Sequence, residues 1–331
     1  MATKPIITII GLGLTGASMG LGLQRETGNF EIVGHDKNPE AAQTARKQGA
    51  VHRTEWNLHR ACEGAELVVI AVPLHELDEL LSQIAEDLSP GALVFALGSL
   101  LQPAVEIAAR RLPPQVHFVA GHPVVNGVGM MPSLRADLYE RAVFALAAGA
   151  NAEPSSVQLA SDFVERIGAT PLFVDAQEHD GIIAGVEQLP DVMAAALMRL
   201  SAANPGWREA RRLAGRSFAG ATDLGDNAAA LFSEFQANRQ NLLFRIRQLQ
   251  RELSEWADLL ETTPAEGEKH PLLSALEQAV LERATWEGQA LLKNWDEAPT
   301  TPEAAPEGGG FLRQMFFGNL MGRRPPPGAQ R

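Results

Sequence analysis

A glycine-rich segment near the N-terminus constrains the fold of this 331-residue chain more than any other feature. An apolar run over residues 6–10 predicts a strand, and the spacing Gly-x-Gly-x-x-Gly follows it at once. We expect a helix to about residue 25, a second strand over residues 30–34 and Asp36 just beyond it. Strand, glycine loop, helix and acidic residue in this order predict a βαβ unit that binds a dinucleotide.

The residues of this loop suit the binding of a pyrophosphate. Gly11 allows a tight turn, Gly13 lets the backbone approach the phosphates, and Gly16 lets helix and strand pack closely. Leu14 and Thr15 open a helix whose free N–H groups attract phosphate. A glycine-rich turn that binds nothing is the alternative interpretation.

The residues after the second strand indicate which dinucleotide is bound. Asp36 would accept hydrogen bonds from the adenosine ribose and would repel a 2′-phosphate, so we expect NAD rather than NADP. Lys37 is adjacent and weakens this preference, which leaves NADP possible.

Short apolar strands alternate with helices up to about residue 175. Further strands are expected over residues 67–73, 93–97, 116–120, 142–147 and 171–174, and the intervening helices over residues 39–48, 74–87, 103–111 and 155–166. This alternation predicts a Rossmann-like, doubly wound parallel sheet of the α/β class. We therefore assign residues 1–175 to a dinucleotide-binding domain.

Residues 176–295 are almost wholly helical in pattern and predict an all-α substrate and dimerisation domain. The longest helix is expected over residues 227–260, and its apolar positions recur in steps of four and three: Leu242, Ile246, Leu249, Leu253, Trp256 and Leu260. Such a helix would extend ~50 Å, longer than a small domain needs, so we expect a homodimer interface. Packing only against a helix expected over residues 272–292 is the alternative.

Composition narrows the possible partners and the location. The net charge of −12, with no long basic stripe, argues against nucleic acid, and the apolar runs are shorter than the ~20 residues of a membrane span. Cys62 is the single cysteine, and no residues have the spacing of a metal site. We expect a cytoplasmic protein. Residues 296–331 predict a flexible linker and an apolar, basic tail, which could dock to a partner or fold back.

Two polar positions follow strands at the edge of the sheet where ligands bind. Ser99 comes after the strand expected over 93–97, and His122 after the one over 116–120. His122 could take the proton of a substrate alcohol while hydride leaves the same carbon, or it could satisfy local backbone groups. His179-Asp180 is interpreted as a helix cap.

Together these residues resemble the prephenate and arogenate dehydrogenase family, NAD(P)-dependent enzymes of tyrosine biosynthesis. The resemblance runs from about residue 6 to 261 and rests on residues 11–18, 34–39, Ala71-Val72-Pro73, Ser99, residues 121–123, 178–180 and Leu189-Pro190. It implies that His122 is the catalytic histidine, that Ser99 orients the substrate and that Val72 and Pro73 lie at the cofactor. It further implies oxidative decarboxylation of a small-molecule substrate, with hydride transfer to NAD.

The chain departs from the family pattern in its substrate-binding half. Glu187-Gln188-Leu189-Pro190-Asp191 stands where the family usually has Ser-His-Leu-Pro-His. Asp223 stands where an arginine usually holds a substrate carboxylate, and its charge is reversed. Two other readings therefore stay open: a dehydrogenase of this family with a less anionic substrate, and a non-catalytic NAD-binding protein that serves regulation or interaction.

Overall fold

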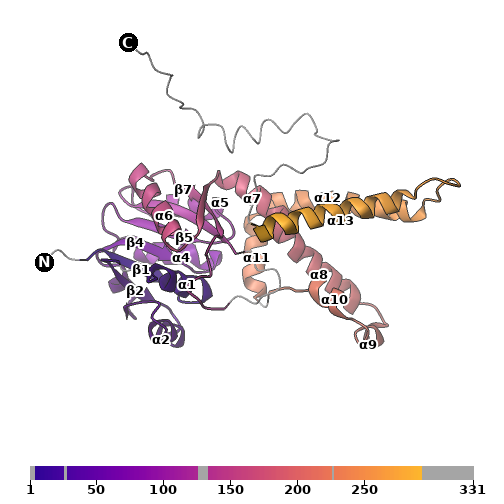
Figure 1. The fold of residues 1–331 in the computed structure, drawn as a ribbon. Coiled ribbons are helices and arrows are strands. Elements are labelled where there is room, and N and C mark those ends of the chain that lie inside the picture. The colour runs from indigo at the N-terminus through magenta and orange to yellow at the C-terminus, as the bar shows by residue number, and fades with distance from the viewer. Residues whose placement is uncertain (1–3, 26–27, 126–132, 226, 293–331) are drawn as a thin grey trace, which may run out of the picture. The chain divides into compact units, whose positions relative to one another are not determined.

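The computed structural model describes residues 4–25, 28–125, 133–225 and 227–292 (Figure 1). The chain forms two compact units, Met1–Thr263 and Pro264–Arg331. The linker and tail expected over residues 296–331 lie outside the described residues.

One eight-stranded sheet organises the first unit, with the strand order β3-β2-β1-β4-β5-β6-β7-β8. Its strands are β1 (Ile6–Ile10), β2 (Glu31–His35), β3 (Arg53–Thr54), β4 (Ala65–Ile70), β5 (Leu93–Leu97), β6 (His117–Val124), β7 (Val143–Ala148) and β8 (Thr170–Phe173). All strands from β3 to β6 in this order pair in parallel. The order reverses between β1 and β4, which is the position where such sheets bind dinucleotides.

Helices cover both faces of the sheet, as the alternating pattern predicts. They are α1 (Leu14–Leu23), α2 (Pro39–Lys47), α3 (Leu58–Cys62), α4 (Leu74–Ile84), α5 (Gln102–Arg111) and α6 (Pro154–Arg166). Successive strand residues point to opposite faces, so Ile9 and Phe95 pack in one apolar core while Ile10 and Val94 pack in the other. Burial on both faces explains why these strands are continuous apolar runs.

The edge of the sheet differs from the sequence prediction in two respects. The strand expected over residues 116–120 continues to Val124, because β7 pairs alongside it through His122 opposite Ala145. β7 also runs antiparallel to β6, although β7 and β8 are parallel to each other. His122 therefore lies within a strand and is held by its ladder, rather than following the strand.

A continuous helix of 27 residues, Ala176–Ala202, leads away from the sheet. It consists of α7 (Ala176–Ile183), a π-helical turn η1 (Ala184–Gln188) and α8 (Leu189–Ala202). By length and composition this helix passes the test for a membrane span, and 22% of its most apolar window is buried. The N-terminal half of this helix is bound to the sheet domain, because Asp180 accepts hydrogen bonds from Leu101 N and Gln102 N.

The prediction of one long helix over residues 227–260 is wrong. The structure has α11 (Ala228–Ala237) and α12 (Arg239–Glu261), preceded by the short helices α9 (Trp207–Ala210) and α10 (Arg216–Ala221). The break falls at Asn238, which is buried and has non-helical backbone angles. Its Nδ2 donates to Asp180 O at 2.8 Å and to Gln188 Oε1 at 2.9 Å, so contacts with the preceding helix fix the break.

The described part of the second unit is a single helix, α13 (Pro271–Leu292). Its bounds agree with the helix expected over residues 272–292.

Candidate active site

The glycine loop lies at the reversal point of the sheet and is tightly packed on one side. Gly11 has a φ of +90°, and a Cβ at this position would lie 2.3 Å from Ala71 O, at the end of β4. A Cβ on Gly16 would lie 2.0 Å from Gly11 O, whereas one on Gly13 would meet nothing within 4 Å. Only glycine fits at the first and third positions, and the second leaves an open face where a pyrophosphate fits.

The other predicted cofactor residues surround this loop. Asp36 accepts hydrogen bonds from Leu12 N through Oδ2 and from Asn38 N through Oδ1, both at 2.7 Å. These bonds hold the carboxylate beside the loop, where it can receive ribose hydroxyls. Lys37, in contrast, is exposed and donates to Glu76 Oε1 at 2.7 Å.

The other predicted cofactor residues lie at the starts of two helices beside the loop. Leu14 and Thr15 form the first turn of α1, and Thr15 O accepts a hydrogen bond from Tyr139. Val72 follows β4, with its Cγ1 3.3 Å from where a Gly11 Cβ would lie, and Pro73 precedes α4. The N–H groups of α1 and the open face at Gly13 therefore fit a dinucleotide.

His122 is the buried centre of a chain of hydrogen-bonding side chains. Its Nδ1 lies 3.1 Å from Nε2 of His179, and Nδ1 of His179 lies 2.9 Å from Asp180 Oδ1. The Asp180 carboxylate in turn accepts hydrogen bonds from Leu101 N at 2.9 Å and from Gln102 N at 3.0 Å, at the start of α5. The chain thus ties β6 to α7 and α5.

This arrangement fixes the protonation of both rings. Because the Asp180 carboxylate only accepts, Nδ1 of His179 carries a proton and Nε2 of His179 is an acceptor. His122 then donates from Nδ1, so that its Nε2 lone pair faces the site. Burial and the neighbouring His179 lower the pKa of His122 to about 4, so this ring is neutral at physiological pH.

The interpretation of His179-Asp180 as a cap of its own helix is wrong. Asp175 caps α7 by accepting hydrogen bonds from Gln177 N and Glu178 N. Asp180 is instead buried one turn into the helix and accepts hydrogen bonds from the first N–H groups of α5, a helix distant in sequence. Only the fold reveals this role.

Three carboxyl groups gather on the other side of His122. Glu187, on η1, places Oε1 3.4 Å from His122 Nε2. Burial, followed by Glu234 and Asp191, raises the pKa of Glu187 to about 7, and burial also raises the pKa values of Asp191 and Glu234. Within the described ranges none of the three forms an ion pair with a lysine or arginine. We call Glu187, Asp191 and Glu234 the carboxyl cluster.

Ser99 lies beside the carboxyl cluster, as well as one strand away from His122. Gly98 N donates to Gly121 O at 3.0 Å, which aligns the two strand ends. The Ser99 Oγ is buried without a hydrogen-bond partner in the described part of the chain. It is close enough to lower the pKa of Glu234 without meeting the geometry of a direct hydrogen bond. A buried, unsatisfied hydroxyl close to Glu234 fits a polar group of a ligand.

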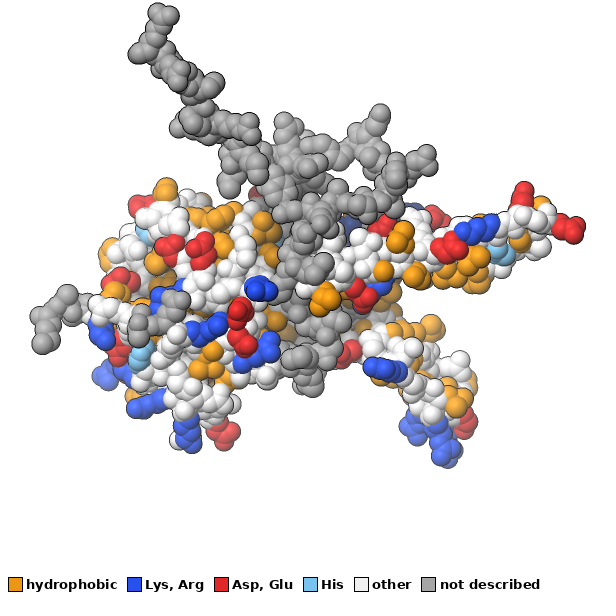
Figure 2. All heavy atoms as spheres, viewed as in Figure 1, with side chains coloured by type: hydrophobic (Ala, Val, Ile, Leu, Met, Phe, Trp, Pro, Cys, Tyr) orange, Lys and Arg blue, Asp and Glu red, His pale blue; other side chains and the backbone are white. Residues whose placement is uncertain are grey.

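Five arginines of the helical region could replace the positive charge of the missing arginine, and none of them forms an ion pair with the carboxyl cluster in the described part of the chain. Four are exposed around α9 and α10, where Figure 2 shows a group of Lys and Arg side chains: Arg208, Arg211, Arg212 and Arg216. Asp223 is exposed after α10 and forms no ion pair with the described residues. It therefore does not join the carboxyl cluster, whereas Glu234, which the sequence did not single out, does.

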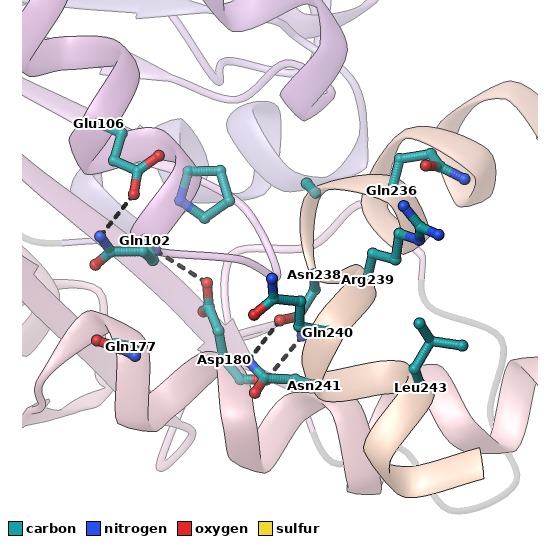
Figure 3. A pocket seen from close by; sticks show the side chains of 12 residues that line it. Gln102, Glu106, Gln177, Asp180, Gln236, Asn238, Arg239, Gln240, Asn241 and Leu243 are labelled. Carbon is teal, nitrogen blue, oxygen red and sulfur yellow. Dashed lines mark hydrogen bonds between the residues drawn. The ribbon is translucent and has the colours of Figure 1, made fainter. Parts of the chain in front are cut away.

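The fifth candidate, Arg239, lines a polar pocket of about 730 Å³ that ends on Asp180 (Figure 3). The pocket lies between α5, α7 and the break at Asn238, and its walls are rich in amides: Gln102, Gln177, Gln236, Asn238, Gln240 and Asn241. His122 does not line it. Among the described residues no group of acidic, histidine or cysteine side chains could hold a metal ion.

Two family models match the chain side by side. One is described as prephenate dehydrogenase, nucleotide-binding domain, and matches residues 19–172; the other, prephenate dehydrogenase, dimerization domain, matches residues 175–278. Together they cover well over half of the chain, and their boundary falls between β8 and α7.

Curated relatives carry the same description. The prephenate dehydrogenase of Lactococcus lactis is 32% identical over 196 residues, which are 58% of this chain and 52% of the relative. That of Bacillus subtilis is 24% identical over 268 residues, 80% of this chain and 72% of the relative. The matched region thus spans about half the length of the first relative.

Solved structures show the same fold. Prephenate dehydrogenase from A. aeolicus, in complex with hydroxyphenyl propionate and NAD+, has a TM-score of 0.74 at 21% identity, over 86% of this chain and 99% of that one. Synechocystis arogenate dehydrogenase has a TM-score of 0.69 at 21% identity, over 85% and 99%. At this level of identity the likeness shows the shared fold.

Proposed function

Because this chain belongs to the prephenate dehydrogenase family, we propose that it is an NAD-dependent dehydrogenase that oxidatively decarboxylates prephenate or arogenate. The observation that carries the proposal is His122, which is held by His179 at the carboxyl edge of the sheet, one strand away from the buried Ser99 hydroxyl. We assign residues 1–175 to the dinucleotide, 176–295 to substrate binding and dimerisation, and 296–331 to a linker and tail.

The side chains of the site act on the hydroxyl group of the substrate. His122 Nε2 accepts the hydroxyl proton, and the Ser99 hydroxyl orients the same oxygen. His179 and Asp180 hold the ring in this tautomer. Bound NAD supplies the acceptor for the hydride. Loss of CO2 and gain of aromaticity make the overall reaction favourable.

The proposal is tested by mixing the protein with NAD and either prephenate or arogenate and following NADH absorbance. We expect turnover that His122→Asn lowers by about 10²- to 10⁴-fold, the usual contribution of an acid–base group. Calorimetry of NAD binding to the same variant is the control, because His122 acts on the substrate. An absence of NADH from both substrates, with NAD bound, would contradict the proposal.

A second candidate is a dehydrogenase of this family with a less anionic substrate. The carboxyl cluster favours it, since three unpaired acidic groups oppose a ligand that carries two carboxylates. Arogenate carries an ammonium group where prephenate carries a ketone, so the ratio of kcat/KM for the two substrates measures this preference. A ratio of ten or more in favour of arogenate supports the second candidate, and a ratio near one removes it.

We also propose a cytoplasmic homodimer formed through the helical region. In the single chain Leu253 and Leu260 of the apolar seam on α12 are 59% and 70% exposed, and Leu200 on α8 is 74% exposed. The match to a dimerization-domain model supports this use of the exposed apolar surface. Light scattering should give twice the chain mass, and Leu253→Glu should shift the mass toward that of the monomer.

A further inference from the structure

The π-helical turn η1 brings a carboxyl group to the reactive nitrogen of the site. Asp180 lies on α7 and Glu187 on η1, within one continuous helix. Asp180 holds the far end of the chain of histidines, and Glu187 Oε1 lies 3.4 Å from the near end, His122 Nε2. π-turns interrupt α-helices rarely and frequently mark functional sites.

Other acidic groups surround Glu187 from two further elements. Asp191 lies one turn along on α8, and Glu234 lies on α11, which packs against α4 of the sheet domain. His122 on β6 is the group that faces Glu187 from the sheet. Among the described residues no lysine or arginine pairs with Glu187, so its negative charge is not neutralised by a fixed cation. A carboxylate in such surroundings holds a proton more readily than an exposed one.

We propose that Glu187 holds the hydroxyl proton of the substrate during the reaction, with His122 as the relay. This inference rests on the proposed dehydrogenase reaction. The O–H bond of the substrate breaks, the proton passes to His122 Nε2 and then to Glu187 Oε1, and the imidazole returns to its neutral form. The C–H bond at the carbon that carries this hydroxyl breaks, and the hydrogen leaves as hydride for the nicotinamide cofactor. The C–C bond to the carboxylate then breaks to release CO2, its electron pair makes the ring aromatic, and the oxygen regains the proton from Glu187 through His122.

The roles of the two residues follow from their surroundings. His122 is a weak base, because burial and His179 hold its pKa near 4. Glu187, with a pKa of about 7, binds a proton more tightly than the imidazole does. The proton therefore moves downhill from the ring to the carboxylate, which holds it until the product oxygen takes it back.

The pH dependence of kcat/KM tests the proposal. The acceptor must be ionised, so the wild-type value should rise with pH through about 7 and then level off. In Glu187→Gln, kcat/KM should no longer rise through pH 7, and its plateau value should be about 10²-fold lower. Glu187→Asp should keep part of the activity, and added formate should partly restore Glu187→Ala. Asp191→Asn should keep the limb but move it to lower pH, because one repelling charge is removed.

A measurement without turnover separates this inference from the proposed function. Nitrogen NMR of the His122 ring should show a shift with a midpoint near pH 7 in the wild type and none in Glu187→Gln. If the wild type is active and the rise of kcat/KM near pH 7 persists in Glu187→Gln, the role of Glu187 is overturned while the proposed dehydrogenase activity stands. If neither substrate yields NADH, the proposed function fails; a missing NMR midpoint then overturns the contact with Glu187, and a midpoint abolished by Glu187→Gln supports it.

Discussion

Nδ1 of His122 and Nε2 of His179 lie 3.1 Å apart, with the two ring planes at 88° to each other. This edge-on contact lets one ring donate along the lone-pair direction of the other. Since the Asp180 carboxylate occupies the opposite nitrogen of His179, the direction of donation is set by the protein. The lone pair on His122 Nε2 is therefore a consequence of two residues on α7.

Replacing His179 should damage turnover more than cofactor binding. In His179→Leu the His122 N–H has no acceptor and the tautomer is no longer fixed, so we expect kcat to fall by about 10²-fold or more. His179→Gln keeps an acceptor oxygen and should lose less. Steady-state rates measure the effect, and the dissociation constant of NAD should stay unchanged in both variants. Equal losses in the two variants would show that the acceptor is unimportant.

Asp180 contributes to stability as well as to the site. Its carboxylate accepts two backbone N–H groups of α5 and the His179 ring, and an amide cannot accept all three. We expect Asp180→Asn to cost about 2–3 kcal/mol in the free energy of unfolding, measured in urea. Asp175→Asn is the matched control, because asparagine caps a helix as well as aspartate does. A loss in the control as large as that in Asp180→Asn would contradict the argument.

Two glycines of the loop should separate folding from cofactor binding. Gly11→Ala combines a positive φ with a Cβ 2.3 Å from Ala71 O, so it should destabilise the fold by at least about 2 kcal/mol. Gly13→Ala meets nothing within 4 Å and should fold normally, yet its methyl group occupies the open face where the pyrophosphate fits. Thermal unfolding should show that Gly11→Ala is the less stable variant, and calorimetry should show that Gly13→Ala is the weaker binder of NAD.

The choice between NAD and NADP should depend on Asp36 rather than on Lys37. Asp36→Asn removes the negative charge that repels a 2′-phosphate, and the NADP-to-NAD ratio of affinities should rise about tenfold, or ~1.4 kcal/mol. Lys37 is exposed and paired with Glu76, so Lys37→Ala should change the ratio less than threefold. A larger effect of Lys37→Ala would show that its side chain reaches the cofactor.

Local sequence rules account for the sheet domain. Apolar runs, glycine spacing and the acidic residue after the second strand are local signals, and they place Gly11, Asp36, Ser99 and His122 at one edge of the sheet. The break at Asn238 could not be predicted in this way, because no proline or glycine interrupts residues 227–260. Its cause is a pair of side-chain hydrogen bonds to residues about fifty positions earlier.

The carboxyl cluster could likewise not be predicted from local sequence signals. Glu187 and Asp191 stand out in the sequence only as departures from a family pattern, and Glu234 has no local signal at all. Their meeting depends on the π-turn and on the packing of α11, both of which are long-range outcomes. Asp180 was misread as a local cap for the same reason, since the N–H groups it binds lie about eighty residues earlier.

The protonation of Glu187 should also appear in the pH dependence of stability. Its pKa rises from an ordinary value of 4.5 to about 7 on folding, so the folded state binds more protons between these values and stability falls as pH rises through the window. Because the side chain is 38% exposed, solvent screening reduces the effect to about 1 kcal/mol. Glu187→Gln removes the charge, so it should raise Tm by about 2–4 °C at pH 8 and leave it unchanged at pH 4.

The matched control for this measurement is Glu66→Gln, on an exposed position of β4, which should leave Tm nearly unchanged at both pH values. A gain of stability at pH 8 in Glu187→Gln together with a loss of turnover would mean that the carboxylate is retained at a cost in stability, as expected of a group kept for proton transfer. No gain at pH 8 would mean that Glu187 is ionised without strain in the folded protein, and the proton would then have to end on His122.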